Sequence, residues 1–158
     1  DLKRQYDGVV SIEMFEAVGE AHWDSYFKKL KGVLKPGGRA VLQIITIDEK
    51  RFEVYRKQAD FIQRHIFPGG MLPSVMALQE KFSQHGFCLD QEMFGECYAR
   101  TIELWRERFE ERWAQISTLG FDQRFYRLWR YYLSYCEGGF KEGAIDVGLF
   151  VLEHQSDR

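Results

Sequence analysis

The sequence has few of the residue types that hold disulfide-rich or metal-binding proteins together. Its three cysteines, Cys88, Cys97 and Cys136, are an odd number at scattered spacing, which matches neither a disulfide framework nor a zinc motif. The four histidines are not spaced as metal ligands either. We therefore expect a reducing, cytoplasmic environment and no metal site.

Long apolar runs and an excess of one charge are also missing. No apolar run approaches the ~20 residues that cross a bilayer, and the opening residues, DLKRQYDG, do not resemble a signal peptide. A formal net charge of -2 gives no electrostatic basis for binding nucleic acid. What is present, 45% hydrophobic and 29% charged residues in 158, is typical of one globular domain. Aromatic residues reach 16%, which suits either a large apolar pocket or a core rich in rings.

The stretch Val9–Gly19, VVSIEMFEAVG, organises the rest of the prediction. It begins as an apolar run, typical of a strand that is buried on both faces. Glu13 and Glu16 follow where that strand should end, and ligands of open α/β sheets bind beyond the carboxyl ends of the strands. Ser11 to Glu16 are therefore candidate site residues. The alternative is that both glutamates are solvated acids in the first turn of the next helix.

A parallel crossover unit follows this strand. Apolar residues in Glu20–Leu34 recur at three and four positions, which predicts an amphipathic helix facing a sheet. The sequence KPGG at positions 35–38 ends that helix, because proline cannot continue it and glycine adopts positive φ. Arg39–Thr46 is then a second buried strand, so that strand, helix and strand form one right-handed parallel unit.

The segment Asp48–Ser74 combines a helical pattern, Phe52 to Ile66, with a turned loop that contains two prolines and two glycines. Its loop is either a lid, one wall of an apolar channel, or an ordinary surface crossover. Ser74 is placed to cap the helix that follows, and Gly86 to end it.

The remaining elements alternate less regularly. The expected elements are a helix over Val75–His85, a strand over Phe87–Gly95, helices over Tyr98–Ile116 and Asp122–Lys141, and a buried strand over Ala144–Leu152. No glycine-rich nucleotide loop follows any of the four strands, since the glycine pairs at 37–38 and 69–70 come after helices. The Val9 strand also needs a neighbour on each edge. We therefore expect this chain to be the carboxyl-terminal part of a larger α/β domain.

Five runs, in order, resemble one known family. The runs VVSIEMFEAVGEAHW, LKPGGRAVLQIIT, FIQRHIFPGGMLPS, YARTIELWRERF and YYLSYCEGGF are similar to those of cyclopropane-fatty-acyl-phospholipid synthases and the related mycolic acid cyclopropane synthases. The resemblance implies a Rossmann-like, seven-stranded methyltransferase sheet, of which this chain supplies strands four to seven and their helices. It implies that the last strand is antiparallel and inserted, and that residues 1–158 are the later portion of a single methyltransferase domain. The segments 48–74 and 98–141 would be acyl-pocket or lid insertions.

The resemblance also implies a reaction. S-adenosyl-L-methionine would transfer a one-carbon unit to the double bond of an unsaturated phospholipid acyl chain, forming a cyclopropane fatty acid in lipid biosynthesis. The family uses a bound bicarbonate ion as the base. Glu16 and Tyr132 match a glutamate and a tyrosine that hold this ion, and Ile45 matches the position whose backbone helps hold it. Without the resemblance, a tyrosine on a helix stripe such as Tyr132 is more often a core residue than a catalytic one.

The resemblance also assigns residues to the cofactor site, and the sequence departs from the family pattern at one position. Ser11, Ile12 and Glu13 fall where the family's strand approaches the adenine of the cofactor. The family's histidine falls at Gln43, and a glutamine cannot carry charge or hand on a proton. Gln43 either orients bicarbonate or marks a subgroup that yields a methylene or methyl-branched chain.

The sequence also fits two other functions. A small-molecule methyltransferase of the same fold is one alternative, and an inactive interaction module is another. The resemblance implies transient, peripheral contact of a cytoplasmic enzyme with membrane lipid, and it allows a homodimer.

Overall fold

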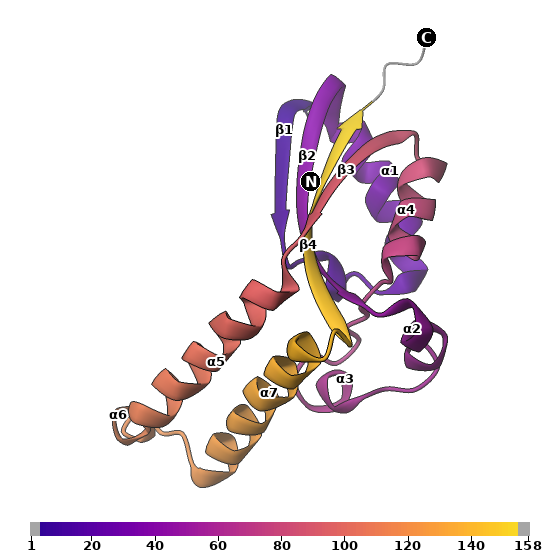
Figure 1. The fold of residues 1–158 in the computed structure, drawn as a ribbon. Coiled ribbons are helices and arrows are strands. Elements are labelled where there is room, and N and C mark those ends of the chain that lie inside the picture. Colours follow the sequence, from indigo (N-terminus) through magenta and orange to yellow (C-terminus); the bar gives the residue numbers. More distant parts are fainter. Residues whose placement is uncertain (1–3, 155–158) are drawn as a thin grey trace. The chain divides into compact units, whose positions relative to one another are not determined.

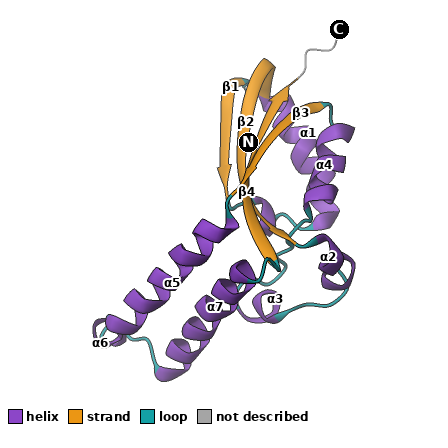
Figure 2. Cartoon of the chain, viewed as in Figure 1, coloured by secondary structure: helices purple, strands orange, loops and turns teal. Residues whose placement is uncertain are grey.

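The computed structural model describes residues 4–154, which fall into two compact units. Within this range, the first unit contains residues 4–93 and 147–154, and the second contains residues 94–146. Figures 1 and 2 show the helices and strands of each unit.

The first unit is built on a four-stranded sheet with the order β1-β2-β4-β3. Its strands are β1 (Tyr6–Ile12), β2 (Leu34–Ile47), β3 (Phe87–Met93) and β4 (Ile145–His154), of which β4 enters the first unit at Val147. β1 and β2 are parallel, whereas β3 and β4 are antiparallel. The last strand therefore lies inserted between β2 and β3, which confirms the expected topology.

The predicted crossover unit is confirmed, with a different start to the second strand. A 3₁₀ turn (Glu20–His22) leads into α1 (Trp23–Val33), which buries Trp23, Phe27, Leu30 and Val33. β2 begins at Leu34 rather than at Arg39. The register with β1 passes from Tyr6 opposite Leu34 to Gly8 opposite Arg39, so the KPGG residues form a bulge. Gly37 has φ of 75°, a conformation that glycine adopts without strain.

The prediction that the first strand is buried on both faces was wrong for the described residues. Val10 and Ile12 are 71% and 52% exposed. The register places them on the same face as Val41 and Gln43. The opposite face of the sheet packs against α1 and α4 (Val75–Gln84), as Figure 1 shows, and it buries alternate residues of β2. The apolar run was read correctly as a strand, but only one of its faces is covered.

The prediction of a single helix between Phe52 and Ile66 was also wrong. The structure has two short helices instead, α2 (Glu49–Tyr55) and α3 (Phe61–His65). Asp60 starts the second one, because its side chain accepts from the Gln63 N–H while the Gln63 side chain accepts from the Asp60 N–H. This capping box interrupts a pattern that is otherwise periodic. The predicted cap of α4 is confirmed, since the Ser74 side chain accepts from the Ala77 N–H.

The second unit is a helical hairpin. It consists of α5 (Gly95–Glu111), the short α6 (Trp113–Ser117) and α7 (Gln123–Lys141). The first helix therefore starts earlier than the predicted Tyr98 and is broken at Arg112. Among the described residues, no helix is long and apolar enough to cross a membrane.

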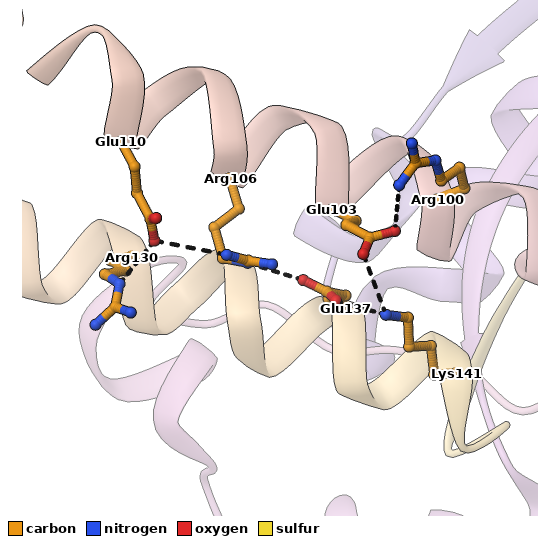
Figure 3. Close-up of polar contacts among 7 residues, drawn as sticks. All are labelled: Arg100, Glu103, Arg106, Glu110, Arg130, Glu137 and Lys141. Atoms are coloured by element: carbon orange, nitrogen blue, oxygen red, sulfur yellow. Dashed lines mark hydrogen bonds and ion pairs between the residues drawn. The ribbon is translucent and has the colours of Figure 1, made fainter.

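Ion pairs join α5 to α7 along their length, as Figure 3 shows. Arg106 on α5 pairs with Glu137 on α7 at 2.9 Å, and Glu110 pairs with Arg130 at 2.7 Å. The Glu137 side chain is only 12% exposed and also pairs with Lys141. These contacts fix the register of the two helices.

Candidate functional site

The candidate site lies where β1 ends, next to the carboxyl-terminal part of β2. After Ile12 the chain passes through Glu13, which has φ of 48°, in the left-handed region. The Glu13 N–H donates to the carbonyl oxygen of Gln43 at 2.9 Å. A 3₁₀ turn (Phe15–Ala17) follows, so neither glutamate starts the regular helix, which begins at Trp23. Glu16 does lie in the first turn of this short 3₁₀ helix, but it is half-buried rather than solvated, and Glu13 precedes the helix.

An aromatic cluster holds this turn against the sheet. The ring of Phe15 is 1% exposed and lies 5.3 Å from Trp23, 5.1 Å from Tyr26 and 5.2 Å from Phe27, measured between ring centroids. Trp23, Tyr26 and Phe27 all belong to the first two turns of α1. Because Phe15 is anchored in this way, its neighbour Glu16 is brought beside β2 rather than into solvent.

Glu16 is the most constrained acid of the site. Its Oε1 accepts from the Ile45 N–H at 2.6 Å, whereas its Oε2 is buried and has no hydrogen-bond partner among the described residues. Burial raises the pKa of the Glu16 carboxyl above its ordinary value, the Ile45 hydrogen bond opposes this, and the nearby Glu13 charge adds to it. A buried acceptor without a donor is costly unless a ligand or water satisfies it.

The other predicted residues of this edge form two separate contacts. Gln43 donates from Nε2 to Oε1 of Glu13 at 2.7 Å, so its side chain contacts Glu13 and not Glu16. The Tyr26 hydroxyl donates to Ser11 Oγ at 3.3 Å, on the face that packs against α1. Ser11 therefore points toward α1, and the exposed Ile12 side chain points to the other face of the sheet.

The turned loop after α3 contributes a contact that sequence reasoning missed. The Met71 N–H donates to the carbonyl oxygen of Glu16 at 2.7 Å, and Gln63 Nε2 donates to the Gly70 carbonyl at 2.8 Å. A Cβ at Gly70 would lie 3.1 Å from the Phe67 carbonyl oxygen, so glycine suits this position. The glycine pair was the available signal, but nothing in the spacing shows that the loop contacts Glu16.

Tyr132 belongs to the second unit, where it lies half-buried on α7 with its ring 5.0 Å from that of Trp129. Its role beside Glu16 stays a prediction. Within the part of the chain that the structure describes, no group of three His, Cys, Asp or Glu side chains could hold a metal ion.

The fold and this edge together define a class of α/β protein in which the last strand is inserted antiparallel and the site lies at the end of a parallel strand. The chain belongs to the mycolic acid cyclopropane synthetase family, whose model matches residues 1–150. This confirms the family that the five sequence runs indicated.

Similar proteins share the match along nearly the whole chain. The chain is 44% identical over 154 residues to tuberculostearic acid methyltransferase UfaA1 of Mycobacterium tuberculosis. It is 37% identical over 150 residues to cyclopropane-fatty-acyl-phospholipid synthase of Escherichia coli. The crystal structure of mycolic acid cyclopropane synthase CmaA1 complexed with SAH and CTAB superimposes with a TM-score of 0.87 at 29% identity. This confirms the predicted α/β fold.

These matches cover most of this chain but only part of each relative. The aligned region is 96% of this chain and 36% of UfaA1, and 95% of this chain and 37% of the Escherichia coli synthase. For CmaA1 the shares are 96% and 56%. The chain thus spans roughly a third to a half of the relatives' length, given these shares.

Proposed function

We propose that the intact protein transfers the methyl group of S-adenosyl-L-methionine to the double bond of an unsaturated phospholipid acyl chain. The observation that carries this proposal is the Glu16 carboxyl, with one oxygen fixed by the Ile45 N–H and the other buried without a partner. Membership of the family and the names of UfaA1 and of the Escherichia coli synthase support a lipid acyl chain as the substrate.

The end of β1 fits part of an S-adenosyl-L-methionine site. Ile12 offers an exposed apolar side chain on which an adenine can pack, and the adjacent Glu13 carboxylate offers acceptors for amino or hydroxyl groups. Ser11 would contribute through its backbone, since its hydroxyl is directed toward Tyr26. When bound, the cofactor supplies an electrophilic methyl group.

Glu16 has the properties that this chemistry asks of the protein. Attack of the alkene on a methyl group leaves positive charge on the acyl chain, which a nearby carboxylate stabilises. Because burial raises its pKa, the carboxyl binds a proton more readily than an exposed one. Oε2 would also accept a hydrogen bond from the O–H of a bicarbonate ion. Glu16 would therefore hold the bicarbonate that the family uses as its base. Ile45 would act by fixing Glu16, because its N–H is already donated to Oε1.

A second product is favoured by the contact of Gln43. Its amide nitrogen donates to Glu13 and not to Glu16, and an amide cannot relay a proton. Ring closure requires removal of a proton from the newly added methyl group. We propose that two other fates of the cation compete with ring closure. A hydride shift followed by loss of one proton from the added methyl group gives a methylene chain, and loss of a proton from a neighbouring chain carbon gives an unsaturated methyl-branched chain. The methyltransferase name of UfaA1 is consistent with a branched product.

We also propose roles for Tyr132 and for the two inserted segments. Tyr132 would help to hold the base, and the segments 48–74 and 98–141 would enclose the acyl chain. The enzyme would work from the cytoplasmic side and contact membrane lipid only peripherally. A homodimer is compatible with this arrangement, and nucleic acid has no part in it.

The acceptor is tested with two phospholipids that share a headgroup but differ in one acyl double bond. The intact protein is incubated with methyl-labelled S-adenosyl-L-methionine and each lipid, and the label in the released fatty acids is counted. We expect label only in the monounsaturated chain. Label in the headgroup, in the saturated chain or in a small molecule alone would overturn the proposed substrate.

A further inference from the structure

The far end of the helical hairpin exposes apolar side chains. This end, residues 112–127, is called the hairpin tip below; it comprises α6, the loop after it and the first turn of α7 (Figure 1). Leu119 in the loop is 76% exposed, and among the described residues no large apolar side chain is more exposed. Phe121 in the same loop is 43% exposed. Single exposed apolar side chains are common, whereas neighbouring ones mark interaction sites, and Leu119 and Phe121 lie two residues apart in one loop.

Stacked aromatic rings of α6 and α7 support this loop. Phe121 stacks on Phe125 with 4.4 Å between ring centroids, and Phe125 stacks in turn on Trp129. Trp113 of α6 lies 4.8 Å from Tyr126 of α7. The exposed residues therefore stand on a well-packed base, and insertion into a partner would not require the tip to fold first.

The hairpin tip is also positively charged. Arg112, Arg124 and Arg127 are exposed, and none of them forms an ion pair with a carboxylate within residues 4–154. Asp122 is the one acidic residue in the tip sequence, and its side chain caps α7 by accepting from the Phe125 N–H at 2.8 Å. Three arginines thus face solvent around two exposed apolar side chains.

The middle of the same hairpin is different, as Figure 3 shows. There, cations and carboxylates pair across the helices, as in Arg106–Glu137, Arg130–Glu110 and Lys141–Glu103. Cations without a carboxylate partner also occur elsewhere in the described residues, Arg108 on α5 among them, but in the tip three of them accompany a single acid, although the whole chain carries a net charge of -2. This local excess of positive charge favours an anionic partner.

We propose that the hairpin tip docks on a phospholipid surface that contains anionic headgroups. Leu119 and Phe121 would insert at the boundary between headgroups and acyl chains, while the arginines contact phosphates. A second copy of the chain is a poorer partner, because two tips would bring like charges together. The docking surface itself does not depend on the proposed function. The inference rests on that function only for the reason for docking, which is to bring the enzyme to its lipid substrate.

The test uses the intact protein and flotation with vesicles of phosphatidylcholine, with or without phosphatidylglycerol. One variant removes the apolar contacts (Leu119→Glu with Phe121→Ser), and another removes the charges (Arg112→Gln, Arg124→Gln, Arg127→Gln). Matched controls change an exposed methionine (Met76→Glu) and three exposed cations (Lys28→Gln, Lys50→Gln, Arg51→Gln) of the first unit. Thermal melting shows that each variant is folded.

We expect partition onto anionic vesicles to fall about tenfold in the apolar variant. In the charge variant it should fall about fivefold for each arginine removed, at low salt. The controls should stay within about twofold. Unchanged partition of both tip variants would overturn the proposal, as would loss of self-association in sedimentation velocity without loss of vesicle binding. Vesicle binding by a protein that methylates no lipid would contradict the proposed function and leave the docking surface supported.

Discussion

Gln43 and Glu13 hold one another through two hydrogen bonds that run in opposite directions. Gln43 Nε2 donates to Glu13 Oε1 at 2.7 Å, and the Glu13 N–H donates to the Gln43 carbonyl at 2.9 Å. Glu13 has φ of 48°, which costs a residue with a side chain about 1–2 kcal/mol. The pair therefore stabilises an unfavourable backbone conformation at the point where the strand ends and the site begins.

The first prediction concerns the product and Gln43→His. A histidine can carry a proton where the amide cannot. We expect the ratio of ring to branched product to rise about tenfold or more in this variant, because it restores the histidine that the resemblance implies beside the bicarbonate base. Gas chromatography with mass spectrometry of the fatty acids measures the ratio. The matched variant Gln43→Ala should lower turnover without adding ring product; an unchanged ratio in Gln43→His would remove Gln43 from control of the outcome.

The second prediction concerns turnover and Glu16→Gln. The amide keeps the acceptor for the Ile45 N–H, but it loses the negative charge and the ability to take up a proton. We expect turnover to fall about 10²- to 10³-fold, in the range typical of a lost acid–base group. Binding of S-adenosyl-L-methionine, measured by calorimetry, should change by less than about twofold. Glu92→Gln on β3 is the control, since Glu92 is exposed there. Near-normal turnover in Glu16→Gln would contradict its place in the site.

The third prediction concerns pH and stability at the same residue. Burial raises the pKa of Glu16 from the ordinary value of 4.5. Below pH 4.5 the carboxyl is protonated whether the chain is folded or not. As the pH rises, the unfolded chain ionises first, so the wild-type protein loses stability that Glu16→Gln retains. Urea unfolding at pH 4.5 and 7.5 should show a larger advantage for Glu16→Gln at pH 7.5. An advantage that shrinks with rising pH would mean that the pKa is not raised.

The fourth prediction concerns the aromatic cluster under the site. Phe27 is fully buried, and its ring lies 5.2 Å from Phe15 and 5.3 Å from Phe82. Phe27→Ala should destabilise the intact protein by about 3–5 kcal/mol, and it should also lower turnover because Phe15 positions Glu16. Met76→Ala, at a residue that is 62% exposed, should cost less than about 0.5 kcal/mol. Equal effects in chemical denaturation would show that the cluster does not support the turn.

The sequence predicts the parallel unit well, because strong local patterns encode it. The helix stripe of Trp23, Phe27 and Leu30 and the apolar run of β2 lead to the observed pairing. The helix expected between Phe52 and Ile66 failed because a capping box at Asp60 outweighs the period of its apolar residues.

The candidate site is only partly encoded in local pattern. Its position at the end of β1 follows from the rule that ligands of open α/β sheets bind beyond the carboxyl ends of the strands. The choice of Glu16 follows from the family motif. The burial of Glu16 depends on Phe15, which packs on α1, and on the Met71 N–H, which comes from a distant loop. The exposure of Val10 likewise depends on which elements cover the sheet. Such long-range contacts leave no trace in residue spacing.

The most direct test of the proposed reaction is the fate of a fully deuterated methyl group. The intact protein is given S-adenosyl-L-methionine with three deuterium atoms on the sulfonium methyl and a monounsaturated phospholipid. The fatty acids are separated by gas chromatography before mass spectrometry, because a methylene chain and a cyclopropane chain with two deuterium atoms have the same mass. We predict a one-carbon extension at the former double bond, with three deuterium atoms in a methyl branch or two in a methylene group. A cyclopropane with two deuterium atoms as the main product would contradict the role given to Gln43. Acyl chains without deuterium would contradict methyl transfer to the alkene itself.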